Sequence, residues 1–319
     1  MPNNYEQIDL SKIKTYPIKN RKNLVKLKDF VRLLPRDATL KEFIGSLPDI
    51  LKGVDLKELI KSISQAYHQK RPVLWACGAH VIKCGLSPLV IELMKKGLVN
   101  CLSLNGAGII HDFEIALIGE TSEDVSKSLL DGSFGMAKET GELINEAIID
   151  GARHNLGIGR AVGKMISAQK LKYREYSILY QGFELNIPIT VHVAIGTDII
   201  HQHPNASGEA IGKGSMIDFH IFTNQVANLE GGVFINIGSA VIIPEVFLKA
   251  LTIVRNLNYT VEDFVTANFD MMIQYRPMSN IVKRPTLKDG KGYSFIGHHE
   301  IMLPLLAYGL LAEIQNNEG

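Results

Sequence analysis

Residues 72–85 read PVLWACGAHVIKCG, an unbroken apolar run followed by a turn that contains two glycines. An apolar run without alternation is typical of a strand that is buried on both faces, as in a parallel sheet covered by helices. Similar runs follow at Val99–Leu104, Ile187–Ile195, Gly232–Ile237 and Phe264–Phe269. Between and after them, helical spacing predicts helices over Leu89–Lys96, Ile109–Leu117, Gly141–Ala152, Gly157–Ile166, Pro244–Val254 and Glu300–Ile314. This alternation predicts an α/β fold with a doubly wound, mostly parallel sheet.

The segment before this pattern has a different character. It is rich in lysine and aspartate, and Thr39 with Glu42 forms a capping box that predicts a helix start. Leu56, Leu59 and Ile63 continue the spacing of a helix. We therefore divide the chain into a helical N-terminal arm, residues 1–70, and an α/β domain, residues 71–319.

The composition excludes several classes of protein. The chain has 319 residues and a formal net charge of +1, so no basic excess is available to neutralise nucleic-acid phosphates. Its three cysteines form no CxxC pair, which fits a reducing compartment. The first residues contain no apolar segment typical of a signal peptide, and no apolar run is long enough for a membrane span. We expect a cytoplasmic protein without nucleic-acid or membrane partners.

Four strand exits are rich in glycine and small polar residues: Gly78–Gly85, Asn105–Asp112, Gly196–Asp198 and Gly238–Ala240. In a doubly wound sheet, ligands bind outside the carboxyl ends of the strands, and glycine lets backbone N–H groups approach a phosphate. The Gly106-Ala107-Gly108 turn does not match GxGxxG, and tight turns needed only for packing are the alternative. Together, the four exits predict a shared binding site at one edge of the sheet.

Histidines provide a second signal. Several follow strands: His80, His111, His201, His203, His298 and His299. If His201 and His203 lie on a strand, their rings share one face, which is a geometry that metal ions use. A metal-dependent hydrolase is therefore one alternative function, although no zinc signature such as HExxH is present. Ordinary polar residues in a cleft are the other interpretation.

Two further segments could contribute to a site. Residues 201–215 are polar and contain glycine, which predicts either a mobile active-site loop or a surface insertion. Tyr275–Pro277 and Lys283–Pro285 place cations in a predicted loop near the sheet, where they are either solvated or bind an anionic ligand.

The order of these motifs resembles the deoxyhypusine synthase family, whose members use NAD to move the aminobutyl group of spermidine onto a lysine. The similarity runs from about Pro72 to the C-terminus, through Gly78–Gly85, Leu104–Asp112, Thr197-Asp198, Gly232–Ala240 and Phe295–Leu306. The resemblance implies an NAD-binding fold, NAD as cofactor, an amine or polyamine substrate, a possible protein acceptor and a homotetramer. The cofactor-binding positions that it implies are Ala79, His80, Cys84, Asn105, Gly106, Ala107, Asp198, Gly238, Ser239, Ala240 and His298.

The catalytic residues follow partly from the resemblance and partly from the residues themselves. The family's tryptophan–glycine–lysine motif is replaced here by Ile281–Pro285, so Lys283 or Lys288 could substitute for its lysine, and Lys283 is our candidate for a covalent imine. His111 follows a strand and titrates near neutrality, which makes it our candidate base, with Asp112 to orient it. We expect an NAD-dependent transferase acting on an amine, with aminobutyl-type transfer. The alternative is a protein that binds NAD but is not catalytic, because the family's lysine motif is missing.

Overall fold

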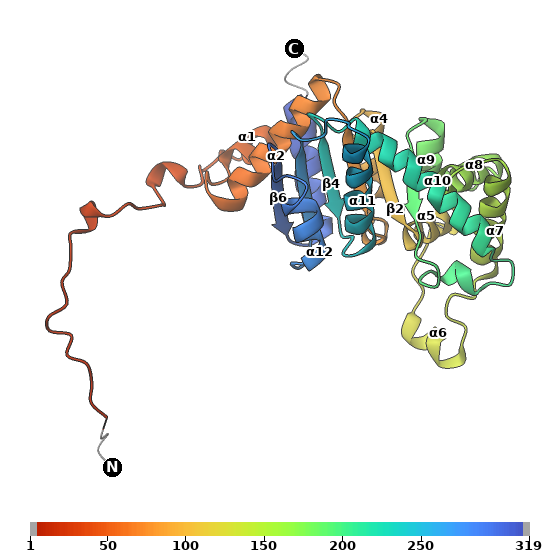
Figure 1. Ribbon diagram of the computed structural model, residues 1–319, viewed down its shortest axis with the longest axis horizontal. Helices are drawn as coiled ribbons and strands as arrows, with labels where there is room; N and C mark the ends of the chain where they lie inside the picture. Colours follow the sequence, from red (N-terminus) through yellow and green to blue (C-terminus); the bar gives the residue numbers. More distant parts are fainter. Residues whose placement is uncertain (1–4, 315–319) are drawn as a thin grey trace.

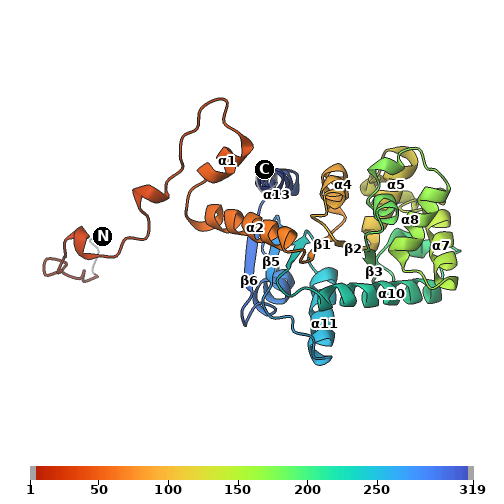
Figure 2. The ribbon, with the colours of Figure 1, turned by 90° about the horizontal axis from the view of Figure 1, so that it is seen from above.

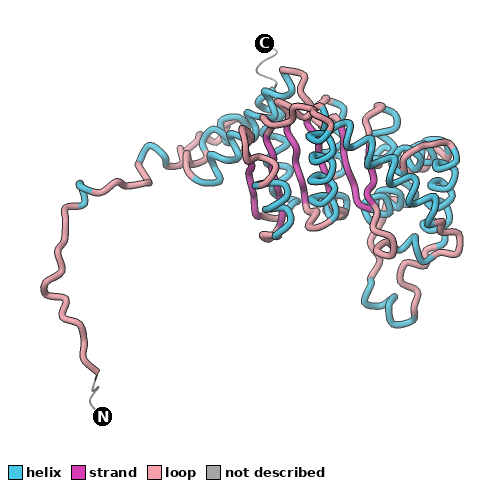
Figure 3. Tube along the Cα trace, viewed as in Figure 1, coloured by secondary structure: helices cyan, strands magenta, loops and turns pink. Residues whose placement is uncertain are grey.

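The computed structural model describes residues 5–314 and contains a sheet in which every strand is parallel to its neighbours (Figures 1 and 3). Six strands are paired in the order β3-β2-β1-β4-β5-β6. Their bounds are β1 Val73–Cys77, β2 Cys101–Asn105, β3 Ile189–His192, β4 Val233–Ile237, β5 Val265–Asp270 and β6 Lys291–Ile296. From β1 the chain winds outward in one direction to β3 and then in the other direction to β6. The fold is thus the predicted doubly wound α/β fold.

The helices fill the connections between strands and the segment before β1. The α-helices are α1 Leu40–Ser46, α2 Leu51–His68, α3 His80–Lys83, α4 Ser87–Lys95, α5 Gly106–Ile118, α6 Val125–Asp131, α7 Lys138–Arg153, α8 Ile158–Ala168, α9 Ile178–Glu184, α10 Gly208–Ala227, α11 Ile242–Asn256, α12 Tyr275–Pro277 and α13 His299–Ile314. The remaining helices are the 3₁₀ helices η1 Ile18–Asn20, η2 Leu27–Asp29, η3 Arg174–Tyr176 and η4 Ile199–Gln202, and the π-helix η5 Met278–Lys283.

Two apolar cores lie on opposite faces of the sheet, because successive side chains of a strand point to opposite sides. Along β1, Trp75 belongs to one core with α2, α4 and α13, whereas Leu74 belongs to the other core with α10 and α11. Figure 2 shows helices on both sides of the strands. In the second core, the rings of Phe234 and Phe247 stack with centroids 4.0 Å apart. Both faces are therefore buried, as the unbroken apolar runs predict.

The N-terminal part consists of two different structures. Leu59 and Ile63 of α2 are fully buried in the core on the sheet, and the Tyr293 hydroxyl donates to Glu58 Oε2 at 2.7 Å. Of the described residues before α1, those in helices belong to η1 and η2, and residues 5–39 run away from the sheet (Figures 1 and 2). Helix α2 thus shares the core of the α/β body, and the domain boundary at residue 70 stays a prediction.

Three local expectations are wrong. His201 and His203 do not lie on a strand, because Ile199–Gln202 forms the 3₁₀ helix η4. The predicted loop over residues 201–215 ends at Ser207, whose side chain accepts the N–H of Ala210 and caps α10. The region 275–283 is helical rather than a loop. Of the described residues, none belongs to a helix that is long and apolar enough to cross a membrane.

Candidate functional site

The six strands are parallel, so their carboxyl ends and the four glycine-containing exits lie at one edge of the sheet. The chain changes its winding direction between β1 and β4, and there the two exits touch. A Cβ on Gly78 would lie 2.4 Å from the carbonyl oxygen of Gly238, so only a residue without a side chain fits at position 78. Such a switch point is where open α/β sheets bind ligands.

The start of α5, directly after β2, is the best-defined part of this edge. The Asn105 side chain caps the helix by accepting the N–H of Gly108 at 3.0 Å. Asp198 comes from the exit of β3 and accepts the N–H of Ala107. A Cβ on Gly106 would lie 1.9 Å from the Asp198 carboxylate, so glycine is required beneath it. Asp198 Oδ2 is buried and has no hydrogen-bond partner among the described residues, and burial raises the pKa of Asp198 to about 6.

A cavity of about 860 Å³ opens beside α5. It is lined by α3, α5, the start of α7, the exit of β3 and residues 120–137 between α5 and α7. Its acidic lining residues are Glu114, Glu120, Glu123, Glu139 and Asp198. Lys83 is the lining lysine, and apolar side chains such as Ile110 and Phe134 cover part of the wall. The carboxylates outnumber the cations, so the cavity suits a positively charged ligand.

His111 of α5 also lines this cavity and belongs to a chain of hydrogen bonds. Its Nδ1 lies 2.7 Å from the Thr121 hydroxyl, which donates to Glu114 Oε2. Thr140 donates to the other carboxylate oxygen of Glu114 at 3.0 Å. Burial, followed by the positive charges of Lys83 and His80, lowers the pKa of His111 to about 4. The imidazole is therefore neutral at neutral pH.

Asp112 does not orient His111. Its carboxylate is fully buried and accepts hydrogen bonds from the Ser177 hydroxyl at 2.5 Å and from the N–H groups of Ile178 and Leu179 at 2.7 and 3.1 Å. These donors form the start of α9, so both carboxylate oxygens serve as a helix cap. The predicted pairing of Asp112 with His111 is wrong because neighbouring helix residues point to different faces.

Lys283 lies away from the cavity. It ends the π-helix η5, whose Ile281 carbonyl accepts the Thr266 hydroxyl at 2.8 Å. A Cβ on Gly292 would lie 2.0 Å from the Val282 carbonyl oxygen. Thr266 and Gly292 are the second residues of β5 and β6, so Lys283 lies near the amino ends of the strands. The structure therefore does not bring Lys283 and His111 together.

The predicted cofactor positions fall into four groups. Ala107 and Asp198 line the cavity, with Asn105 and Gly106 beside them at the start of α5. Those at the β1 exit are Ala79, His80 and Cys84, and those at the β4 exit are Gly238, Ser239 and Ala240. His298 follows β6, is 65% exposed and lies 3.9 Å from Glu300. All of them lie at the carboxyl edge, although only the first group reaches the cavity wall.

The histidines that suggested a metal site are engaged elsewhere. His201 Nδ1 accepts the N–H of Gly196 at 3.1 Å, and His203 Nε2 donates to the Gly135 carbonyl at 2.8 Å. Across residues 5–314, no group of three or more His, Cys, Asp or Glu side chains is placed to hold a metal ion. The hydrolase alternative therefore has no ligand set in this part of the chain.

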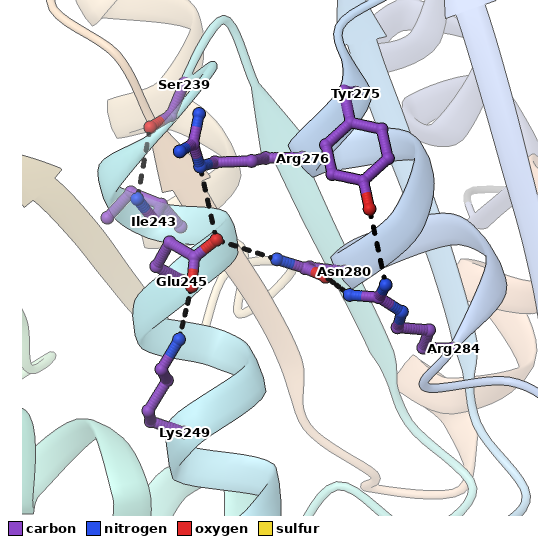
Figure 4. Close-up of polar contacts among 8 residues, drawn as sticks. All are labelled: Ser239, Ile243, Glu245, Lys249, Tyr275, Arg276, Asn280 and Arg284. Carbon is purple, nitrogen blue, oxygen red and sulfur yellow. Dashed lines mark hydrogen bonds and ion pairs between the residues drawn. The ribbon is translucent and has the colours of Figure 1, made fainter.

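The cations near residue 280 are bound to neighbouring side chains (Figure 4). Arg276 Nε lies 3.3 Å from Glu245 Oε1 on α11, and the same carboxylate accepts the Asn280 amide at 2.9 Å. Arg284 donates to Asn280 Oδ1 at 2.7 Å. This cluster joins α11 to η5 and explains these cations without an anionic ligand.

Sequence reasoning missed most of the cavity's acidic lining and also Thr121 and Lys83. One signal was available, because Glu114 follows His111 by three residues and so lies on the same helical face. Glu120 and Glu123 gave no such signal, because their positions depend on the path of the chain after Gly119, which ends α5 with φ +80°.

The fold and the site together define a class of doubly wound α/β proteins with an acidic ligand cavity at the carboxyl edge. No protein-family model and no curated protein matches the sequence. Solved structures share the fold. A protein from Entamoeba histolytica, provisionally named a deoxyhypusine synthase, has a TM-score of 0.53 and 12% identity over 87% of this chain and 94% of its own.

Two other solved structures are similar at the same level. AgrE, solved in a ternary complex with ornithine and NAD⁺, has a TM-score of 0.52 and 13% identity over 82% of this chain. This chain spans only 33% of AgrE. A conserved protein of Methanococcus maripaludis S2, provisionally named LOR/SDH, has a TM-score of 0.50 and 16% identity over 89% of this chain and 72% of its own. These similarities establish the fold.

Proposed function

We propose that this protein is an NAD-dependent enzyme that oxidises a cationic amine, as the first half of an aminobutyl-type transfer. The observation that carries the proposal is the cavity of about 860 Å³, which combines five carboxylates with a neutral histidine at the ligand-binding edge of the sheet. Carboxylates bind ammonium groups through charge-assisted hydrogen bonds. A homotetramer and a protein acceptor, both implied by the family resemblance, remain predictions.

The residues at the carboxyl edge fit a dinucleotide. Gly78 lets the β1 and β4 exits pack together at the switch point, since a Cβ there would lie 2.4 Å from the Gly238 carbonyl oxygen, and a switch point is where open α/β sheets bind ligands. Asp198 Oδ2 is buried beside Gly106 and has no partner among the described residues, and we assign it as the acceptor for a ribose hydroxyl. AgrE has a related fold and was solved with NAD⁺ and ornithine, which supports the combination of this cofactor with an amine ligand.

The chemistry divides between the chain and the cofactor. When bound, NAD⁺ supplies a hydride acceptor. The carboxylates of the cavity hold the ammonium group, and His111 accepts one N–H proton from it. The neutral amine can then lose a hydride from the neighbouring carbon, which leaves a C=N bond. One ammonium ion thus yields one iminium ion, one hydride and one proton on His111.

The second half of the transfer needs a lysine near the imine. Because Lys283 lies near the opposite edge of the sheet, we assign this role to Lys83, which lines the cavity. Its nitrogen would form a bond to the iminium carbon as the bond from that carbon to the second part of the substrate breaks, and this part would leave as an ammonium ion that takes up the proton given up by Lys83. A Lys83→Gln variant should still reduce NAD⁺ but should not form an imine that borohydride can trap.

The test combines binding and turnover. Thermal shift with NAD⁺, and then with diamines, spermidine and ornithine, should show stabilisation by NAD⁺ and by at least one amine. NADH formation, followed by absorbance, should accompany the active amine. His111→Ala should keep the NAD⁺ shift and lose turnover, whereas His154→Ala, which changes an exposed histidine directly after α7, should keep both. NAD⁺ binding without turnover on any amine would instead favour the non-catalytic alternative.

A further inference from the structure

Glu114 and Thr121 hold His111 in a defined orientation, and the protonation of this trio can be derived from its hydrogen bonds. The Thr121 hydroxyl has a single proton, which it donates to Glu114 Oε2. Its oxygen also lies 2.7 Å from His111 Nδ1. The hydroxyl proton is already used, so this second contact must be a donation from the imidazole to the hydroxyl. Nδ1 therefore carries the proton of the neutral ring.

The other ring nitrogen is consequently the basic one. His111 Nε2 makes no hydrogen bond within residues 5–314, and the ring lines the acidic cavity. A neutral histidine has one donor and one acceptor nitrogen, so fixing the proton on Nδ1 leaves the Nε2 lone pair for a ligand. Because burial and nearby positive charge lower the pKa of His111, this neutral form prevails at neutral pH.

We propose that Glu114 and Thr121 are positioning residues, which act as a relay that selects the Nδ1–H tautomer of His111 and presents Nε2 as the base. The role as a base rests on the proposed function, whereas the tautomer can be tested without it. Glu114 stands one helical turn from His111 on α5, and its carboxylate is fixed by Thr121 and Thr140. Thr121 comes from the segment after α5 that lines the cavity.

The relay therefore joins the base to a segment that lines the cavity. Residues 119–137 leave α5 at Gly119 and carry Glu120, Glu123 and Phe134 into the cavity wall. A ligand that moves this segment would move Thr121 and release the Nδ1 proton from its acceptor. A competent base thus requires that Thr121 keeps its present position when the amine binds.

The experiment is nitrogen-15 NMR of the apo protein, labelled at histidine, at neutral pH. Long-range proton–nitrogen spectra distinguish the two neutral tautomers, and the spectrum of His111→Gln identifies the signals of His111. The wild type should show His111 protonated on Nδ1. Thr121→Val should move His111 toward the Nε2–H form, and Thr121→Ser, which restores a hydroxyl, should return it.

Thr140→Val is the matched control. It also removes a hydroxyl that donates to the Glu114 carboxylate, but this hydroxyl makes no hydrogen bond with His111. It should leave the His111 tautomer unchanged. The inference is overturned if the wild-type ring is protonated mainly on Nε2, or if Thr121→Val leaves its spectrum as it was. Fluorescence of Trp75, which is buried in β1, confirms that each variant is folded.

A second readout links the relay to the reaction. With the active amine, Thr121→Val should lower kcat by about 10- to 100-fold and leave KM nearly unchanged, since the base is lost but the carboxylates remain. If the tautomer result holds but no amine is oxidised by any variant, the proposed function fails and the relay stands. If amines are oxidised and Thr121→Val has full kcat, the relay is not part of catalysis.

Discussion

The substitution Asp112→Asn separates a structural from a catalytic role for this residue. Oδ1 accepts one N–H and Oδ2 accepts one N–H and one hydroxyl, all from the start of α9. An asparagine keeps only one acceptor oxygen, so its NH₂ group must face a buried donor. The loss of one charge-assisted hydrogen bond costs about 1.5–3 kcal/mol, and the unpaired donor costs about 1–3 kcal/mol more.

We therefore expect Asp112→Asn to lower the free energy of unfolding by about 3–5 kcal/mol, or Tm by roughly 5–10 °C. Urea unfolding followed by Trp75 fluorescence measures this loss, because the tryptophan is 1% exposed and lies in the central strand β1. Asp131→Asn, at the exposed end of α6, is the control and should change stability by less than about 0.5 kcal/mol. A loss below about 1 kcal/mol at Asp112, accompanied by lost turnover, would refute the structural role.

Three further predictions concern the cavity. Gly106→Ala places a Cβ 1.9 Å from the Asp198 carboxylate and should destabilise the fold by about 1–3 kcal/mol in urea unfolding, whereas Gly212→Ala, with nothing within 4 Å, should not. The stability of the wild type relative to His111→Gln, measured as a difference in urea midpoints, should fall as the pH drops from about 7 toward 4. The reason is that the unfolded histidine binds its proton near pH 6.5 and the folded one only near 4. A difference in urea midpoints that stays constant with pH would contradict the lowered pKa. Glu139→Gln removes one carboxylate from the cavity and should weaken amine binding several-fold in calorimetry, with a smaller effect at high salt. If the variant and the wild type bind the amine with equal affinity at low salt, Glu139 has no electrostatic role.

The parts of the fold that sequence predicts are those with a regular apolar pattern. Strands β1 to β5 coincide with largely apolar runs because both faces of the sheet are buried, although β2 and β5 also contain polar residues such as Ser103 and Asn268. Strand β6 was missed because it lies at the edge, where Lys291 and Gly292 are exposed and the apolar run is broken. Most of α10 was missed because its first part contains several glycines, which favour loops in general. One of them, Gly214, packs against Ile158, where a side chain would not fit.

For the site, sequence located the edge of the sheet but not the partners of each residue. His111 was identified because it follows a predicted strand, and the structure places it on the cavity wall. Helical spacing places Glu114, and not Asp112, on the His111 face of α5, but the hydrogen-bond partners of the two carboxylates depend on the packing of α9 and of residues 119–137. Likewise, the sequence does not show which lysine lies at the cavity. Lys83 lines it and Lys283 lies near the amino ends of the strands because of the paths of the segments that connect the strands.

Helix α5 separates two tasks that neighbouring residues perform. On one side of this helix, Asp112 accepts hydrogen bonds from the start of α9. On the adjacent side, His111 lines the cavity. Changes on the ligand side can therefore alter which ligand the cavity accepts while the hydrogen bonds of Asp112 to α9 are kept. Directed evolution of new specificity would begin with the cavity-facing positions of α5 and leave Asp112 untouched.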